Sequence, residues 1–183
     1  MDDDIRIRYL LNVYFGRIAE NPVRAAVKRA YLDFARTQHG FANNKRRAEI
    51  QHEREEYLIE RISTLCATIF KSQEEFDYFH RETVSGLQRI SQNSFSVGQA
   101  QKWINMSIKY CAIINPDAFS QNLRYYHVPI DNILLTRLHG YPQIGTWSRL
   151  EDYELYLRFQ NWFREQANCE IPLIRELQIW ERE

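Results

Sequence analysis

Six basic side chains in the N-terminal third of the chain have the types and spacing to contact phosphate groups. Residues 5–47 contain ten arginines and lysines against Glu20 and Asp33, a local excess of eight positive charges. Carried on neighbouring helices, such side chains could follow a nucleic-acid backbone. The six residues of this predicted nucleic-acid-binding stripe are Arg24, Lys28, Arg29, Lys45, Arg46 and Arg47.

The acidic segment that follows gives a second interpretation of the same residues. Residues 48–82 contain nine acidic residues against four basic ones, and the whole chain has 24 of each sign and no formal net charge. If helices from the two segments pack side by side, the basic side chains would be neutralised within the protein. Nucleic-acid-binding domains are usually basic overall, so the balance of charge favours this interpretation.

Arg47 and His52 form a separate candidate pair, with Ala-Glu-Ile-Gln between them. This segment resembles the R-x(4–6)-H motif of the HEPN family of small helical ribonucleases. The resemblance implies that Arg47 would bind the scissile phosphate and that His52 would move protons while a ribose 2′-hydroxyl attacks, in a site usually built by two protomers. It covers six residues, and Ala48 stands where the family has a polar residue. The alternative is an exposed, salt-bridged helix face, because charged residues of both signs alternate from 47 to 56.

Residues 122–131 form the third candidate region, which we call the site loop. Its candidate residues are Arg124, Tyr125, His127 and Asp131. Irregular segments often hold functional residues, and Asp131 is close enough in sequence to orient the imidazole of His127. The alternative is structural, with Asp131 capping the helix that follows Pro129 and the aromatic rings packing the loop on the core.

Motifs for common cofactors and nucleophiles are absent from the sequence. It contains no glycine-rich phosphate loop, no G-x-S-x-G nucleophile motif and no H-E-x-x-H zinc motif. The three cysteines (Cys66, Cys111 and Cys169) are widely spaced, which is typical of reduced thiols and not of a zinc or disulfide framework. We therefore expect no metal and no cofactor.

The start of the chain bears on its location. Residues 1–4 are Met-Asp-Asp-Asp, without the basic and apolar segments of a secretory signal. No apolar run approaches the roughly 20 residues that span a bilayer. We expect a cytoplasmic protein without membrane contact.

The elements that would position the candidate residues are helices almost throughout. Only six glycines and five prolines occur, fewer than a turn-rich β-fold requires. Apolar residues recur at helical spacing, and the pairs Asn21-Pro22, Ser72-x-x-Glu75 and Ser148-x-x-Glu151 are helix-start signals. We expect one all-α domain over residues 1–183, a bundle of about seven or eight helices with an irregular aromatic segment near 116–128. The expected helices cover about residues 4–19, 22–39, 44–70, 73–90, 97–114, 130–138, 149–167 and 172–180.

A longer pattern resembles a set of small bacterial proteins that have no assigned activity. The resemblance covers about the C-terminal half, implies a bacterial or phage origin, and carries over no functional residues. The pattern consists of Gly98-Gln-Ala-Gln-Lys-Trp-Ile-Asn-Met-Ser-Ile-Lys-Tyr110, His127-x-Pro129-Ile-Asp131, Trp147-x-x-Leu150, and Pro172 followed by Ile179-Trp180.

The composition predicts a binding protein. The chain has four tryptophans, eleven tyrosines and ten phenylalanines, and Trp, Tyr and Arg are the residue types that anchor interfaces. With no catalytic motif of higher specificity, we expect a non-enzymatic helical protein that binds another macromolecule, either a protein partner or a second copy of itself. The alternatives are a HEPN-like, metal-independent ribonuclease and a nucleic-acid-binding regulator that uses the basic stripe.

Overall fold

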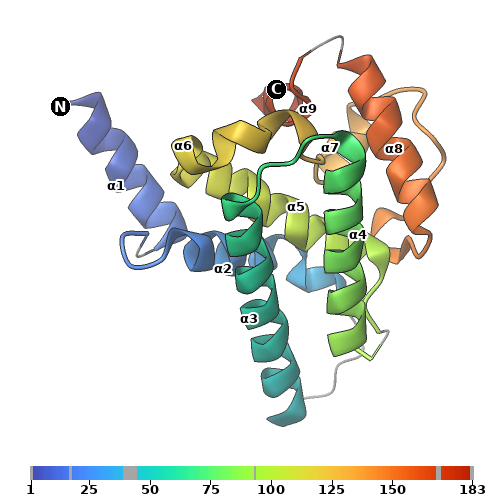
Figure 1. The fold of residues 1–183 in the computed structure, drawn as a ribbon, viewed down its shortest axis with the longest axis horizontal. Coiled ribbons are helices and arrows are strands. Elements are labelled where there is room, and N and C mark those ends of the chain that lie inside the picture. The colour runs from blue at the N-terminus through green and yellow to red at the C-terminus, as the bar shows by residue number, and fades with distance from the viewer. Residues whose placement is uncertain (1, 17, 39–44, 93, 168–169, 182–183) are drawn as a thin grey trace.

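The computed structural model describes residues 2–16, 18–38, 45–92, 94–167 and 170–181, and for Lys45 the backbone only. Within them the fold is all-α, as the sequence predicts, with nine α-helices, seven of which have ten or more residues (Figure 1). The α-helices are α1 (Asp3–Phe15), α2 (Pro22–Phe34), α3 (Lys45–Ala67), α4 (Gln73–Ile90), α5 (Val97–Ile114), α6 (Pro116–Phe119), α7 (Asn132–Thr136), α8 (Tyr153–Gln166) and α9 (Pro172–Glu181). Short 3₁₀ helices cover Ala35–Thr37, Ser120–Tyr125 and Trp147–Arg149.

Local capping signals set the starts of α2 and α4. The side chain of Asn21 accepts a hydrogen bond from a backbone N–H of the first turn of α2, and Pro22 occupies the first helical position. Ser72 caps α4 in the same way. Both starts are confirmed. The expected end of the second helix at His39 and Gly40 lies outside the described residues.

The predicted start of α8 at Ser148 is wrong. Residues Trp147–Arg149 form a 3₁₀ helix, and α8 begins at Tyr153. Asp152 is the capping residue, because its carboxylate accepts backbone hydrogen bonds from Glu154 and Leu155. A carboxylate at this position also interacts favourably with the helix dipole, so Asp152 has the stronger local signal.

Helix α5 lies at the centre of the fold. Every residue from Val97 to Cys111 is buried, because α2, α4 and α8 pack on different sides of it. In Figure 1 it crosses behind α3 and α4. Trp103 has no exposed surface, and its indole N–H donates to the carbonyl of Val27 at 2.9 Å. The sequence predicts the apolar inward side of this helix correctly, but the polar side is buried as well.

Gly98 allows α5 to approach the 3₁₀ helix Trp147–Arg149 very closely. Its N–H donates to the carbonyl of Leu150 at 2.9 Å. A Cβ atom at this position would lie 1.7 Å from the carbonyl oxygen of Trp147. Because that neighbour is backbone and cannot rotate away, glycine is required here. The contact fixes the position of the Trp147 indole beside α5.

The segment expected to be irregular contains α6 and the 3₁₀ helix Ser120–Tyr125, followed by extended backbone to Asp131. Extended backbone inside a helical protein has no strand partner, so its polar groups need side-chain partners. The amide of Gln101 bonds both the carbonyl (2.9 Å) and the N–H (3.1 Å) of Ile130. Gln160 does the same for Val128, at 2.9 Å each. Two glutamines thus replace a neighbouring strand.

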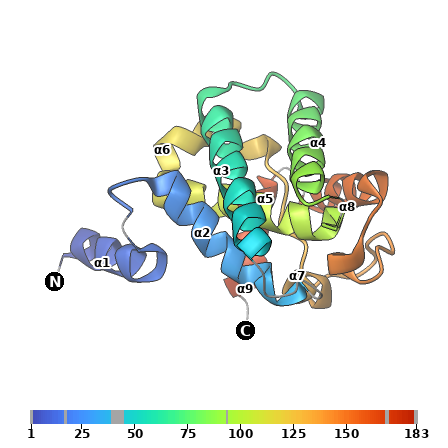
Figure 2. The same cartoon turned by 90° about the horizontal axis from the view of Figure 1, so that it is seen from below.

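Helix α1 lies apart from the other helices. Figure 1 and Figure 2 both show it at the edge of the molecule, beyond α2. None of its residues is buried. The described hydrogen bonds and ring contacts between α1 and the rest of the molecule involve Tyr14 and Phe15, at its C-terminal end.

Candidate functional site

The residues of the predicted ribonuclease pair do not converge. Arg47 and His52 both lie on α3, and a separation of five residues places two side chains about 140° apart around a helix axis. The side chain of His52 is 74% exposed, and it lies 3.8 Å from the carboxylate of Glu56 on the next turn. Within one copy of the chain, these two residues do not face a common groove.

The α2 part of the predicted nucleic-acid-binding stripe is paired with acidic residues. The guanidinium of Arg24 donates two hydrogen bonds to the carboxylate of Glu56, at 2.5 and 2.9 Å. These bonds hold the pKa of Glu56 below its usual value. The ammonium of Lys28 lies 3.6 Å from the carboxylate of Glu55. This is the local neutralisation by α3 that the charge balance of the sequence favours.

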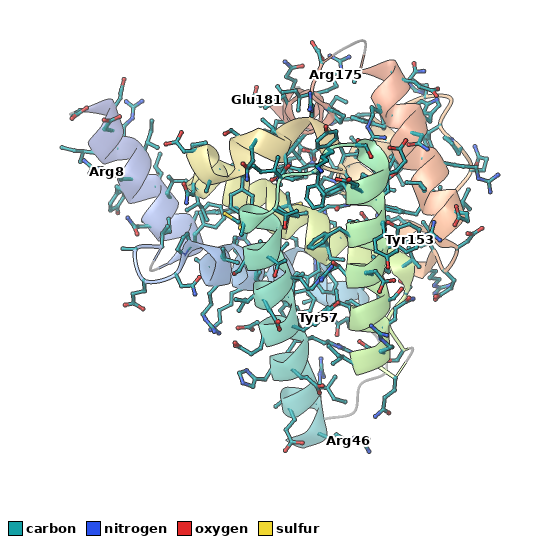
Figure 3. All side chains as sticks on the ribbon, viewed as in Figure 1. Arg8, Arg46, Tyr57, Tyr153, Arg175 and Glu181 are labelled. Carbon is teal, nitrogen blue, oxygen red and sulfur yellow. The ribbon has the colours of Figure 1, made fainter. Side chains whose placement is uncertain are left out.

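The remaining members of the stripe lie elsewhere. Arg46 lies at the N-terminal end of α3, far from Tyr57 in Figure 3. Ten residues of helix place it about 15 Å from Glu56. Arg29 donates to the hydroxyl of Tyr14 at 2.7 Å. The side chain of Lys45 lies outside the described part of the chain. The described basic residues therefore form separate groups and not one continuous stripe.

The candidate residues of the site loop also have separate roles. Arg124 is exposed and stacks over the ring of Tyr125 at 4.7 Å. Asp131 caps α7 by accepting from the N–H of Leu134 at 2.8 Å, as the structural alternative predicts. Its other oxygen accepts from the ammonium of Lys102 at 2.5 Å. Asp131 therefore does not orient His127.

Asp77 of α4 is the carboxylate that orients His127. Nε2 of His127 lies 2.8 Å from Oδ1 of Asp77, and Nδ1 lies 2.8 Å from the hydroxyl of Tyr156 on α8. A carboxylate only accepts hydrogen bonds, so we assign the proton of the neutral imidazole to Nε2. The Tyr156 hydroxyl then donates to Nδ1. Three segments far apart in sequence are thereby joined through one buried ring.

A second histidine extends this buried network. Nε2 of His80 lies 3.0 Å from the side-chain oxygen of Asn105, and Nδ1 lies 2.8 Å from the hydroxyl of Tyr153. Tyr153 lies where α8 meets α4 in Figure 3. The His80 and His127 rings are 4.7 Å apart between centroids. The amide of Asn105 also donates to Tyr156 at 2.9 Å, which connects the two histidines.

The network favours the neutral form of both histidines. Burial lowers the pKa of His80, and a positive charge on His127 would lower it further. Burial also lowers the pKa of His127, although the hydrogen bond and the charge of Asp77 oppose this fall. An aspartate, a histidine and a hydroxyl joined in a row by hydrogen bonds could pass a proton. However, His127 has no exposed surface and His80 has 1%, so a substrate cannot reach either ring. The network stabilises the packing of α4, α5 and α8.

We expect acid to destabilise the protein through these histidines. Their pKa values are lowered in the fold, so the free energy of unfolding is highest above the unfolded-chain pKa of about 6.5 and falls as pH drops below it. Each histidine contributes a slope of up to about 1.4 kcal/mol per pH unit. Urea denaturation between pH 7.5 and 5.5 measures this slope.

The variant His80→Gln should show a shallower slope than the wild type, and His52→Gln, at an exposed position, is the matched control. Glu176 acts in the opposite sense, because burial raises its pKa. It is present in all three proteins, so the difference between slopes reports His80 together with its effect on the neighbouring His127. Equal slopes in the wild type and His80→Gln would contradict the prediction.

The buried polar side of α5 carries two lysines. Lys102 and Lys109 are separated by seven residues, or about two turns, and are 3% and 5% exposed. Lys102 pairs with Asp131, and Lys109 donates to both oxygens of Glu176 at 2.9 and 2.7 Å. Burial of a lysine is rare without such partners. The seven-residue spacing was the sequence signal for this arrangement, but no local feature indicated the two carboxylates.

Helix α1 exposes six large apolar side chains. They are between 47 and 66% exposed, and they surround the helix on more than one side. Large apolar side chains gathered on one helix are normally covered by other parts of a structure. The six residues of this α1 surface are Ile5, Ile7, Tyr9, Leu10, Val13 and Tyr14.

Comparison with known proteins gives no relative: no family model, no curated protein and no solved structure matches the chain. In the part of the chain that the structure describes, no three His, Cys, Asp or Glu side chains gather as a metal site would require. The helices of that part are also too short or too polar to cross a bilayer.

Proposed function

We propose that this protein is a non-enzymatic binding protein and that α1 docks on a second copy of the same chain. The α1 surface carries the proposal. Its first three turns have no enclosing partner within the described residues, although they carry five large apolar side chains that are exposed. We expect the assembly to form in the cytoplasm, where the free thiols of Cys66 and Cys111 stay reduced.

The area of the α1 surface fits a dimer. Six side chains that each expose about half of their surface offer about 600 Å² per copy, or about 1,200 Å² for two copies, which is the lower end of stable interfaces. Because the apolar residues spread over about half of the helix circumference, one neighbouring helix cannot cover them all. A pair of copies supplies two surfaces, since each α1 would contact both the other α1 and the body behind it.

The geometry and charge of α1 favour an antiparallel pair. Ile5, Tyr9 and Val13 recur every four residues on one side of the helix. With a two-fold axis at Tyr9, Ile5 of one copy faces Val13 of the other, and the interface is self-complementary. The acidic residues 2–4 of one copy then approach the C-terminal end of the second α1, near Lys28, whose side chain is 58% exposed.

Sedimentation velocity over about 1–100 µM tests this proposal, since a micromolar complex dissociates across that range. We expect a concentration-dependent dimer for the wild type and a monomer for the double variant Tyr9→Lys/Val13→Lys. The matched control is Tyr78→Lys on α4, because Tyr78 is 68% exposed and Tyr9 is 65% exposed. The control should dimerise as the wild type does.

Two results would overturn the proposal. One is a wild-type protein that stays monomeric at about 100 µM, because a dimer with a micromolar Kd would form at that concentration. The other is a dimer that survives the Tyr9→Lys/Val13→Lys change but is lost in Tyr78→Lys, which would move the interface from α1 to α4. Circular dichroism of each variant confirms that the bundle is folded, since none of these side chains is buried.

A further inference from the structure

The two buried lysines of α5 form the floor of a cavity of about 580 Å³. Arg29 of α2, Arg36 of the 3₁₀ helix Ala35–Thr37, Trp147 and Trp180 also line it. The volume is within the range of about 300–1,000 Å³ that small-molecule sites occupy. Four segments distant in sequence therefore enclose a space of suitable size for a ligand.

The cavity has an excess of positive charge. Four of its lining residues are cationic (Arg29, Arg36, Lys102 and Lys109), and two are anionic (Asp33 and Asp131), which leaves an excess of two positive charges. Glu176, the partner of Lys109, has no exposed surface and lies behind the ammonium. At that point the cavity therefore meets N–H groups and not a carboxylate.

These cations keep hydrogen-bond donors that the protein does not use. An ammonium has three N–H groups and a guanidinium five. The described hydrogen bonds take one donor of Lys102, two of Lys109 and two of Arg29. Arg36 is exposed and has no ion pair or hydrogen bond among the described residues. An acceptor-rich, anionic group in the cavity would use these free donors.

Two indole rings also line the cavity. The backbone of Trp147 lies against Gly98 and its side chain is 7% exposed, whereas Trp180 is 39% exposed. The ammonium of Lys109 lies 5.4 Å from the Trp180 ring centroid. Indole faces bind flat rings by stacking. A ligand that fits this lining has an anionic group at the cations and a planar ring on an indole face.

We propose that this cavity binds a small organic anion, a carboxylate or phosphate carried on a planar ring. The proposal does not rest on dimerisation, although Tyr14 of the α1 surface also lines the cavity. Phenyl phosphate is the probe, with inorganic phosphate and phenol as partial probes that each lack one half of the ligand. Titration followed by isothermal calorimetry and by tryptophan fluorescence measures the binding, because two of the four tryptophans line the cavity.

Substitutions of Arg36 and Trp180 test the cationic and the aromatic parts of the lining and leave the buried ion pairs intact. We expect Arg36→Gln to weaken phenyl phosphate binding about tenfold, as the loss of a charged hydrogen bond does. Trp180→Ala should weaken phenyl phosphate about three- to tenfold and leave inorganic phosphate unchanged. Arg158→Gln, which removes an exposed arginine of α8, is the control and should bind as the wild type does.

Three results would overturn the proposal. The first is the absence of saturable phenyl phosphate binding at concentrations up to about 10 mM, because a specific site would have a lower Kd. The second is phenol binding as tightly as phenyl phosphate, which would remove the role of the cations. The third is equal weakening of binding by Arg36→Gln and Arg158→Gln, which would mean that the net charge of the protein alone explains the effect.

Discussion

Replacing Trp103 with alanine is expected to lower the free energy of unfolding by about 3–5 kcal/mol, the usual cost of deleting a buried aromatic side chain. Trp103 has no exposed surface. Its ring packs 5.3 to 5.5 Å from the rings of Tyr31 and Phe34, measured between centroids. The change would leave a cavity where α2 meets α5 and would also leave the carbonyl of Val27 without its indole donor.

Urea denaturation of Trp103→Ala and of Trp180→Ala measures this prediction. Trp180 is the matched control, because its side chain is 39% exposed and lies at the rim of the molecule. We expect the control to lose less than about 1 kcal/mol, as is usual for surface substitutions. A loss of that size in Trp103→Ala would mean that α5 does not present this face to α2.

Breaking the buried ion pair between Lys109 and Glu176 is expected to have a similarly large effect. Lys109→Met should cost about 3–5 kcal/mol at pH 7, because it leaves a fully buried carboxylate without its partner. Burial already raises the pKa of Glu176, and the ammonium of Lys109 opposes that rise. Without the lysine, the pKa of Glu176 rises further.

The sign of the pH dependence separates this effect from simple loss of packing. A carboxyl group with a raised pKa contributes stability below its unfolded pKa of about 4.3 that is lost as pH rises. The cost of Lys109→Met should therefore be smaller at pH 5 than at pH 7. The double variant Lys109→Met/Glu176→Met should recover most of the lost stability, because an apolar pair can replace a buried ion pair. A double variant as unstable as the single one would contradict the prediction.

The helices were predictable because their signals are local. Asn21 and Ser72 cap helices through backbone groups three residues away, and the apolar stripe of α5 is visible in about four turns of sequence. Asp152 shows the limit of this approach. Ser148 lies four residues earlier with a similar capping signal, but residues Trp147–Arg149 form a 3₁₀ helix and the carboxylate of Asp152 caps α8.

The contacts that define the site were not predictable because they join distant segments. The partner of His127 is Asp77, 50 residues away, whereas Asp131 is four residues away and faces another direction. Lys109 pairs with Glu176 across 67 residues. A polar helix face normally indicates solvent, and the seven-residue spacing of Lys102 and Lys109 places them on one face without indicating that this face is buried. For α1, the apolar pattern correctly predicts a helix, but the burial that such a pattern indicates is absent within one copy of the chain.

The enclosure of α5 has a consequence for synthesis on the ribosome. Helix α2 packs against α5 more extensively than any other pair of described elements, yet α5 begins more than 60 residues after α2 ends. At roughly 5–20 residues per second, α2 waits several seconds with its apolar face uncovered. During that interval the nascent chain offers a hydrophobic segment to chaperones, and folding cannot be completed until the C-terminal half has emerged.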